Sequence, residues 1–208
     1  MAVPRGSSQL TAAPRPRRDP RVTGLALLAV MVAGMWAVEV VDLVTGDLDA
    51  NGIRPRDESA LPGIVLAPFL HGSFGHLIGN TIPLALLGAV IALGGLRRIA
   101  IVTTIVALTA GVGTWMAAPV NTLHIGASGI VFGYISYLVV RGLYSRSLLH
   151  FAAGVIVFVL WGGTLLTGLV PEPGISWQGH LFGALGGILA ARVVHATSTS
   201  SRRRPDAV

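Results

Sequence analysis

Four polar side chains interrupt hydrophobic stretches of this 208-residue sequence and could do chemistry together. Ser128 lies in the tetrapeptide GASG at 126–129, whose small residues leave its hydroxyl accessible, and His180 opens a later hydrophobic stretch. His76 and Asn80 are four residues apart, so they share one face of a helix. A histidine can take the proton of a serine hydroxyl, and attack by that serine on a carbonyl creates an oxyanion that needs N–H donors. The pattern predicts acyl-transfer chemistry.

The composition of the chain indicates a membrane protein. Hydrophobic residues make up 52% of the sequence and charged residues only 12%, whereas a soluble domain carries about 25% charged residues. The mean hydropathy is +0.72. So few charges cannot cover a water-facing surface, which excludes a soluble enzyme, a disordered chain and a basic nucleic-acid-binding module. We expect a multi-pass protein of the lipid bilayer with no nucleic-acid partner.

Residue types that are missing narrow the chemistry further. Without cysteine there is no disulfide, thiolate nucleophile or cysteine-ligated metal, and without lysine there is no Schiff base or Ser–Lys dyad. No His-Glu-x-x-His motif occurs, so neither a metal nor another cofactor is predicted. No acid lies near His180 in the sequence, which favours a Ser–His dyad over a triad.

Hydrophobic runs predict an all-α bundle of six membrane spans. The predicted spans cover residues 22–44, 74–93, 99–118, 127–141, 148–170 and 178–195, and together they form one domain over residues 22–195. The residues between 61 and Phe74 are interpreted as a loop at the membrane interface. Residues 1–21 and 196–208 are polar and basic, and they are predicted to be disordered cytoplasmic tails.

The arginines predict how the chain faces across the membrane. With the N-terminus inside, 13 of the 15 arginines fall on the inner side, and only Arg54 and Arg56 fall outside. Both termini are therefore predicted to be cytoplasmic, and the expected location is the plasma membrane. Glu39 and Asp42 end the first span on the outer side, where we expect them to be solvated.

Helix geometry predicts that polar residues of three spans lie at one depth. Ser128, His180 and Asn80 are each 12 or 13 residues from the inner ends of their spans, or about 18–20 Å in a hydrocarbon core about 30 Å thick. Glycine pairs in the fourth and sixth spans would allow the close approach that a Ser–His hydrogen bond needs, although such pairs also occur where helices merely pack. The pairs are Gly129 with Gly133, and Gly183 with Gly187.

These segments resemble the rhomboid family of intramembrane serine proteases. The resemblance rests on HGSFGHLIGN at 71–80, GASG at 126–129 and GHLFGALGG at 179–187, which stand in the family's order on its second, fourth and sixth spans. It extends over the six-span region. It implies that transmembrane segments of other membrane proteins are the substrates, cleaved near the outer side in a polar cavity that opens to the extracytoplasmic side.

The resemblance also implies roles for individual residues. These are the nucleophile Ser128, the general base His180, and an oxyanion site at His76 and Asn80 with support from Gly126. Phe132 falls where many relatives have a tyrosine that stacks on the catalytic histidine, so stacking is expected without a hydroxyl hydrogen bond. The sequence departs from the family in two places: the first loop has no Trp-Arg pair, and Gly179 stands where alanine is usual.

Two other functions remain open from the sequence. A rhomboid-like bundle could bind client transmembrane helices without cleaving them. A transporter could line its pathway with buried His and Asn, although the spans show no inverted repeat and no acidic relay. His71 is interpreted as structural or interfacial, and His124 as a hydrogen-bonding loop residue. The substrate, its cleavage site and the oligomeric state are not predicted.

Overall fold

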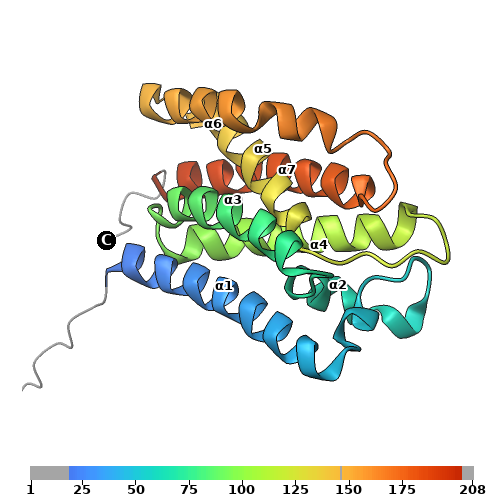
Figure 1. The fold of residues 1–208 in the computed structure, drawn as a ribbon. Coiled ribbons are helices and arrows are strands. Elements are labelled where there is room, and N and C mark those ends of the chain that lie inside the picture. Colours follow the sequence, from blue (N-terminus) through green and yellow to red (C-terminus); the bar gives the residue numbers. More distant parts are fainter. Residues whose placement is uncertain (1–18, 146, 203–208) are drawn as a thin grey trace, which may run out of the picture.

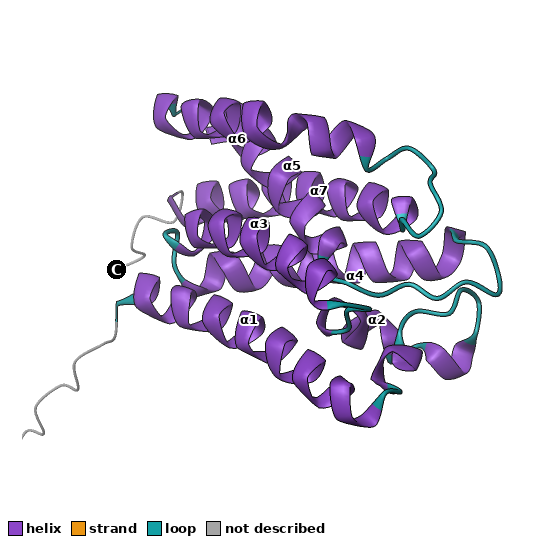
Figure 2. Cartoon of the chain, in the orientation of Figure 1, coloured by secondary structure: helices purple, strands orange, loops and turns teal. Residues whose placement is uncertain are grey.

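The protein is an all-helical bundle in a computed structural model that describes residues 19–145 and 147–202 (Figure 1). The helices are α1 Pro20–Thr45, α2 Gly63–Leu66, α3 Phe74–Ala92, α4 Leu96–Ala117, α5 Ser128–Ser145, α6 Leu148–Thr167 and α7 Trp177–Arg202. Short 3-10 helices occupy Leu48–Asn51, Glu58–Ala60 and Ala67–Phe69. No strand occurs within the described ranges (Figure 2). In these ranges a single antiparallel bridge joins Ile53 and His124. The predicted all-α class is confirmed.

Five of the described helices are long and apolar enough to cross a membrane, which identifies an integral membrane protein. They are α1, α3, α4, α6 and the Trp177–Ala196 part of α7. The helix α5 is not among the five, and ten of its residues are buried. It packs against α3, α4, α6 and α7. A helix with so many protein neighbours can carry more polar residues than a helix that faces lipid.

Two stretches differ from the sequence-based expectation. Residues 61–73, expected as a loop, contain α2 and the 3-10 helix Ala67–Phe69. Pro68 lies in the first turn of that 3-10 helix, where its missing N–H leaves no hydrogen bond unmade. The last helix continues to Arg202, beyond the predicted end of the sixth span. The rest of the predicted tails, residues 1–18 and 203–208, lies outside the described residues.

The C-terminal end of α1 also differs from expectation. Gly46 adopts a left-handed backbone conformation with φ of 72° and reverses the chain after α1. The following segment folds back, so that Asp42 accepts a hydrogen bond from the N–H of Leu48 at 2.7 Å. Glu39 is only 6% exposed, and the expectation that it is solvated is therefore wrong.

The first turns of α3 bring two polar residues to one side of the bundle. Ser73 caps the helix, because its hydroxyl accepts the N–H of His76 at 3.2 Å. Asn80 lies one turn further along and is buried. Pro83 stands inside the same helix. A proline in a helix interior removes one backbone hydrogen bond, which membrane helices tolerate when neighbouring groups replace it.

Glycines bring the backbones of α5 and α7 into contact. A methyl group added to Gly183 would overlap the carbonyl oxygen of Gly129, and one added to Gly187 would overlap the carbonyl oxygen of Gly133. The hydroxyl of Ser136 adds a hydrogen bond to the carbonyl of Ala184 at 2.7 Å. Side chains larger than hydrogen at these glycines would force the two helices apart.

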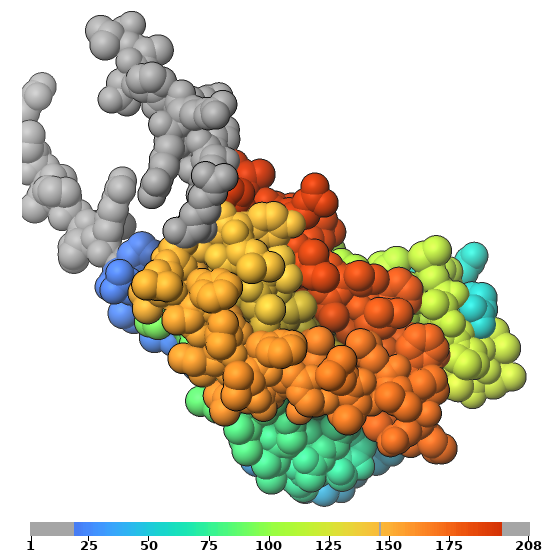
Figure 3. All heavy atoms as spheres, turned by 90° about the horizontal axis from the view of Figure 1, so that it is seen from above, coloured from blue at the N-terminus to red at the C-terminus, as the bar shows by residue number. Residues whose placement is uncertain are grey.

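The helix α6 lies at the edge of the bundle. It is outermost in Figure 1, and its atoms cover much of the face seen in Figure 3, beside α7. Its buried residues are only Gly154, Val157 and Gly162. Because so little of α6 is fixed by packing, its position depends on the loops and on its contact with α5.

The helix contact predicts that Gly183→Ala destabilises the protein. The added methyl group has no room against Gly129, so the free energy of unfolding should fall by about 1–3 kcal/mol, the usual cost of overpacking. Thermal unfolding in detergent measures this change. Gly163→Ala in α6 is the matched control, because a methyl group there meets nothing within 4 Å. Equal unfolding temperatures for the two variants would contradict the tight contact.

Candidate active site

A hydrogen bond joins Ser128 and His180 across the α5–α7 contact. The hydroxyl of Ser128 lies 2.9 Å from Nε2 of His180. The other ring nitrogen, Nδ1, lies 2.7 Å from the carbonyl oxygen of Gly168 at the end of α6. A carbonyl oxygen can only accept, so Nδ1 carries the proton and Nε2 is free to accept the proton of the serine hydroxyl. This is the protonation state that a general base needs.

The ring of Phe132 fixes the plane of the His180 ring. The two rings stack with their centroids 4.0 Å apart and their planes at 7°. A methyl group added to Gly168 would overlap the Phe132 ring, so this glycine leaves space for the stack. Phe132 therefore lies where the sequence analysis expected a stacking residue.

The backbone just before Ser128 lies against the polar residues of α3. Gly126 has a left-handed φ of 104°, and a Cβ atom there would lie 2.7 Å from the His76 ring and 3.3 Å from Nδ2 of Asn80. Asn80 is only 5% exposed, and its Nδ2 has no hydrogen-bond partner among the described residues. A buried amide donor is costly to leave unpaired, so these N–H groups are available to an anion or a carbonyl oxygen.

Two large cavities meet at these residues. One, of about 980 Å³, lies among the loops after α4 and α6 and is lined by His76, Asn80, Ser128 and His180. The other, of about 540 Å³, opens between α3 and α6, where Pro83 and Trp161 line it together with Asn80, Ser128 and His180. Asn80, Ser128 and His180 are therefore reachable both from the loops and from the side of the bundle, whereas His76 lines only the cavity among the loops.

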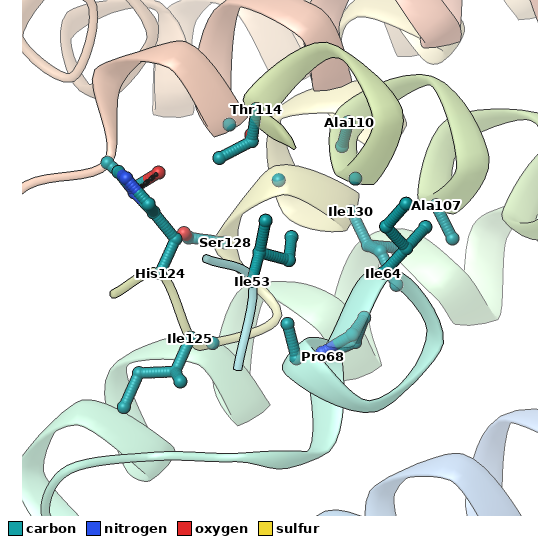
Figure 4. Close-up of a pocket in the computed structure, with 16 residues that line it drawn as sticks. Ile53, Ile64, Pro68, Ala107, Ala110, Thr114, His124, Ile125, Ser128 and Ile130 are labelled. Atoms are coloured by element: carbon teal, nitrogen blue, oxygen red, sulfur yellow. Dashed lines mark hydrogen bonds between the residues drawn. The ribbon is translucent and has the colours of Figure 1, made fainter. Parts of the chain in front are cut away.

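A third and much smaller cavity lies behind Ser128. Its volume is about 40 Å³, and its lining includes Ala110, Thr114, His124 and Ser128 (Figure 4). One water molecule needs about 10–15 Å³ of such volume and two to four polar partners. The cavity therefore has room for water, or for a small side chain, directly beside the serine hydroxyl.

Comparisons with known proteins assign the chain to a family. The profile of the rhomboid domain matches residues 59–197. The uncharacterized protein Rv1337 of Mycobacterium tuberculosis (strain H37Rv) is 40% identical over 196 residues, which cover 89% of this chain and 81% of that protein. This chain belongs to the rhomboid family. The uncharacterized protein ML1171 of Mycobacterium leprae (strain TN) is 40% identical over 89% of this rhomboid and 77% of its own length. YdcA of Bacillus subtilis (strain 168), named as a candidate rhomboid protease, is 27% identical over 58% of this chain and 60% of its own.

Two more histidines lie near the site of this rhomboid, and neither of them is hydrogen-bonded to Ser128. His71 is 1% exposed, and its ring meets the His76 ring edge-on at 5.0 Å. Neither of its ring nitrogens has a hydrogen-bond partner in the described part of the chain, and burial lowers its pKa to about 4. His124 hydrogen-bonds Thr122 and Ser176 in the loops, and burial lowers its pKa as well. No group of three or more acidic or histidine residues that could hold a metal occurs among the described residues.

Two contacts, one in the site and one in the loop after α1, could not be expected from the sequence. The carbonyl of Gly168 orients His180, and no sequence signal could have shown this, because every residue has a carbonyl. Arg56 was noted only for its charge, yet its guanidinium donates to the carbonyls of Met116 and Ala118 at 2.8 Å and so ties the loop after α1 to the end of α4. Trp115 completes this tie by donating to the carbonyl of Asp57 at 3.1 Å.

The buried His71 predicts a loss of stability in acid. Its pKa in the folded protein is about 4 against an ordinary 6.5, so the folded state holds the neutral ring. The stabilisation is complete above pH 6.5 and is lost as the pH falls from 6.5 towards 4. His71→Phe removes the titrating group, so its unfolding temperature should fall less steeply over this range than that of the unmodified protein. If the unfolding temperatures of the two proteins fell equally between pH 6.5 and 4, His71 would not contribute to the loss of stability in acid.

Proposed function

We propose that this rhomboid is an intramembrane serine endopeptidase that cleaves transmembrane segments of other membrane proteins by a Ser128–His180 dyad. The observation that carries the proposal is the hydrogen bond from the Ser128 hydroxyl to Nε2 of His180, with Nδ1 held by the carbonyl of Gly168. This arrangement sets the proton on the correct nitrogen without an acidic residue. Membership of the rhomboid family supports the same reaction.

In the proposed reaction, His180 takes the proton of Ser128 as the hydroxyl oxygen attacks the substrate carbonyl. The carbonyl oxygen becomes an oxyanion, which the side chains of His76 and Asn80 and the backbone N–H of Ser128 stabilise. Collapse of this intermediate breaks the peptide bond, and His180 returns the proton to the leaving amine. Water then attacks the acyl-serine in the same way, and the small cavity beside Ser128 could supply it.

We propose that the chain crosses the plasma membrane six times, with both termini in the cytoplasm. The helix α5 is the remaining span, since it packs against every one of the five apolar helices except α1. The 980 Å³ cavity then opens to the extracytoplasmic side, because its lining includes residues of the loops after α4 and α6. Among the described residues, Arg21, Arg97, Arg98, Arg141 and Arg192 lie towards the opposite ends of the helices, which agrees with the positive-inside tendency.

The substrates would be transmembrane segments that unwind readily. An intact helix hides its carbonyl groups in its own hydrogen bonds, so the scissile bond must leave the helix before Ser128 can attack. The 540 Å³ cavity between α3 and α6 offers a side entrance. The 40 Å³ cavity beside Ser128 accommodates only a small side chain next to the scissile bond.

Replacing either member of the dyad tests the proposal most directly. Ser128→Ala and His180→Ala should each lower cleavage of a single-span substrate in proteoliposomes by at least about 10³-fold, because the nucleophile or its base is lost. A fluorophosphonate probe should form an adduct at Ser128, detected by mass spectrometry, and Ser128→Ala should abolish it. Ser147→Ala, at the inner end of α6, is the control and should leave both measurements unchanged. Binding of client helices without cleavage or adduct would favour the non-catalytic function instead.

The oxyanion role of Asn80 has its own signature. Asn80→Ala should lower kcat by about 10²-fold, as loss of one oxyanion donor does, with a smaller change in KM. Asn80→Asp keeps the size of the side chain but replaces the amide donor by an oxygen, so it should be as impaired as the alanine variant. If the aspartate variant kept most of its activity, the N–H group would not be the functional part of Asn80.

A further inference from the structure

A second Ser–His pair lies beside the first, with the two residue types exchanged. His124 precedes Ser128 by four residues, and Ser176 precedes His180 by four. Nδ1 of His124 lies 2.7 Å from the hydroxyl of Ser176, and both pairs join residues 52 positions apart. One hydrogen bond thus links α7 to α5, and the other links the residue just before α7 to the loop just before α5.

The donors and acceptors of this second pair follow from its neighbours. The hydroxyl of Thr122 donates to the carbonyl of Pro119 at 2.6 Å, so its oxygen is left to accept from Nε2 of His124 at 2.8 Å. Nδ1 of His124 is then the acceptor, and the hydroxyl of Ser176 donates to it. The hydrogen bonds therefore run in one direction, from Ser176 to His124 to Thr122 to the carbonyl of Pro119, and they fix the orientation of the His124 ring.

Both residues of the pair also make backbone hydrogen bonds, one with the loop after α1 and the other with His180 itself. The backbone of His124 exchanges hydrogen bonds with Ile53 at 2.9 and 3.0 Å, which ties it to the loop after α1. The carbonyl of Ser176 accepts the N–H of His180 at 3.1 Å, so Ser176 belongs to the first turn of α7. Any shift of that turn moves the His180 ring relative to Ser128.

Gly179 leaves the space that Ser176 needs. A Cβ atom at this position would lie 3.0 Å from the hydroxyl oxygen of Ser176 and 3.3 Å from that of Thr114. Contacts this short require the neighbouring atoms to move by a few tenths of an ångström. Gly179, which stands where alanine is usual in the family, thus leaves room for the hydroxyl of Ser176.

We propose that His124 and Ser176 are positioning residues, which hold the first turn of α7 so that His180 stays within hydrogen-bond distance of Ser128. The proposal rests on the proposed proteolytic function. Both residues also line the 40 Å³ cavity beside Ser128, and the role assigned to the pair is to fix the position of the helix rather than to bind the substrate. Loss of the pair should therefore lower kcat and the reactivity of Ser128 while the protein still folds and KM changes little.

The test uses the full chain in proteoliposomes. The quantities measured are kcat and KM for a single-span substrate, and the rate at which a fluorophosphonate labels Ser128. Ser176→Ala should lower both kcat and the labelling rate by about 10-fold to 100-fold, the scale of a misplaced catalytic group. His124→Leu should have the same effect. The double variant should be no worse than either single variant, because both remove one interaction.

Conservative variants separate positioning from simple packing. His124→Asn places an amide oxygen near the position of Nδ1 and should restore most of the activity lost in His124→Leu. Gly179→Ala should impair the enzyme, and less so when Ser176 is also alanine, because the crowded hydroxyl is then gone. Ser59→Ala is the control, since Ser59 also bonds a side chain in an outer loop, at 2.6 Å from Asp57.

Several results would overturn the positioning role. These are wild-type rates in Ser176→Ala, equal losses in His124→Asn and His124→Leu, or a probe adduct on Ser176 in the Ser128→Ala protein, which would make Ser176 a second nucleophile. If the unmodified protein neither cleaved substrate nor reacted with the probe, the proposed function itself would fail, and the positioning role with it.

Discussion

The close approach of α5 and α7 is the constraint on which the site depends. A hydrogen bond of 2.9 Å between side chains as short as Ser128 and His180 requires helix backbones in direct contact. The glycines at 129 and 183 provide that contact, since a methyl group on Gly183 would overlap the neighbouring carbonyl. In a bilayer this contact gains nothing from the hydrophobic effect, so it relies on packing and on hydrogen bonds such as that of Ser136 to the carbonyl of Ala184.

Much of this arrangement could be predicted from the sequence because membrane physics restricts the choices. Helix rise and membrane thickness placed Ser128, His180 and Asn80 at one depth, and in the structure all three line the same two cavities. The spacing of His76 and Asn80 predicted a shared helix face, and both lie against Gly126. Both predictions depend on helix geometry, which is the same in every sequence.

The features that could not be predicted depend on the loops and on backbone atoms. Glu39 is buried near the end of α1, and just beyond it the chain turns at Gly46, a single left-handed residue. The hydrogen bond from His180 to the carbonyl of Gly168 depends on where α6 ends. Neither hydropathy nor residue type contains this information. The second pair, His124 with Ser176, was visible as a spacing of four residues, but only the folded loops show that the two side chains meet.

The surroundings of His180 suit a base without an acidic partner. In the proposed reaction the ring becomes positively charged once it has taken the proton of Ser128. An aspartate would stabilise that charge, but it would also place an anion within the membrane in the resting enzyme, at a high desolvation cost. The Gly168 carbonyl orients the ring without a net charge. The face of Phe132, at 4.0 Å, can stabilise the cation through its ring electrons when the cation forms. The missing tyrosine hydroxyl therefore removes little from the reaction, because the aromatic face is the part that contacts the charged ring.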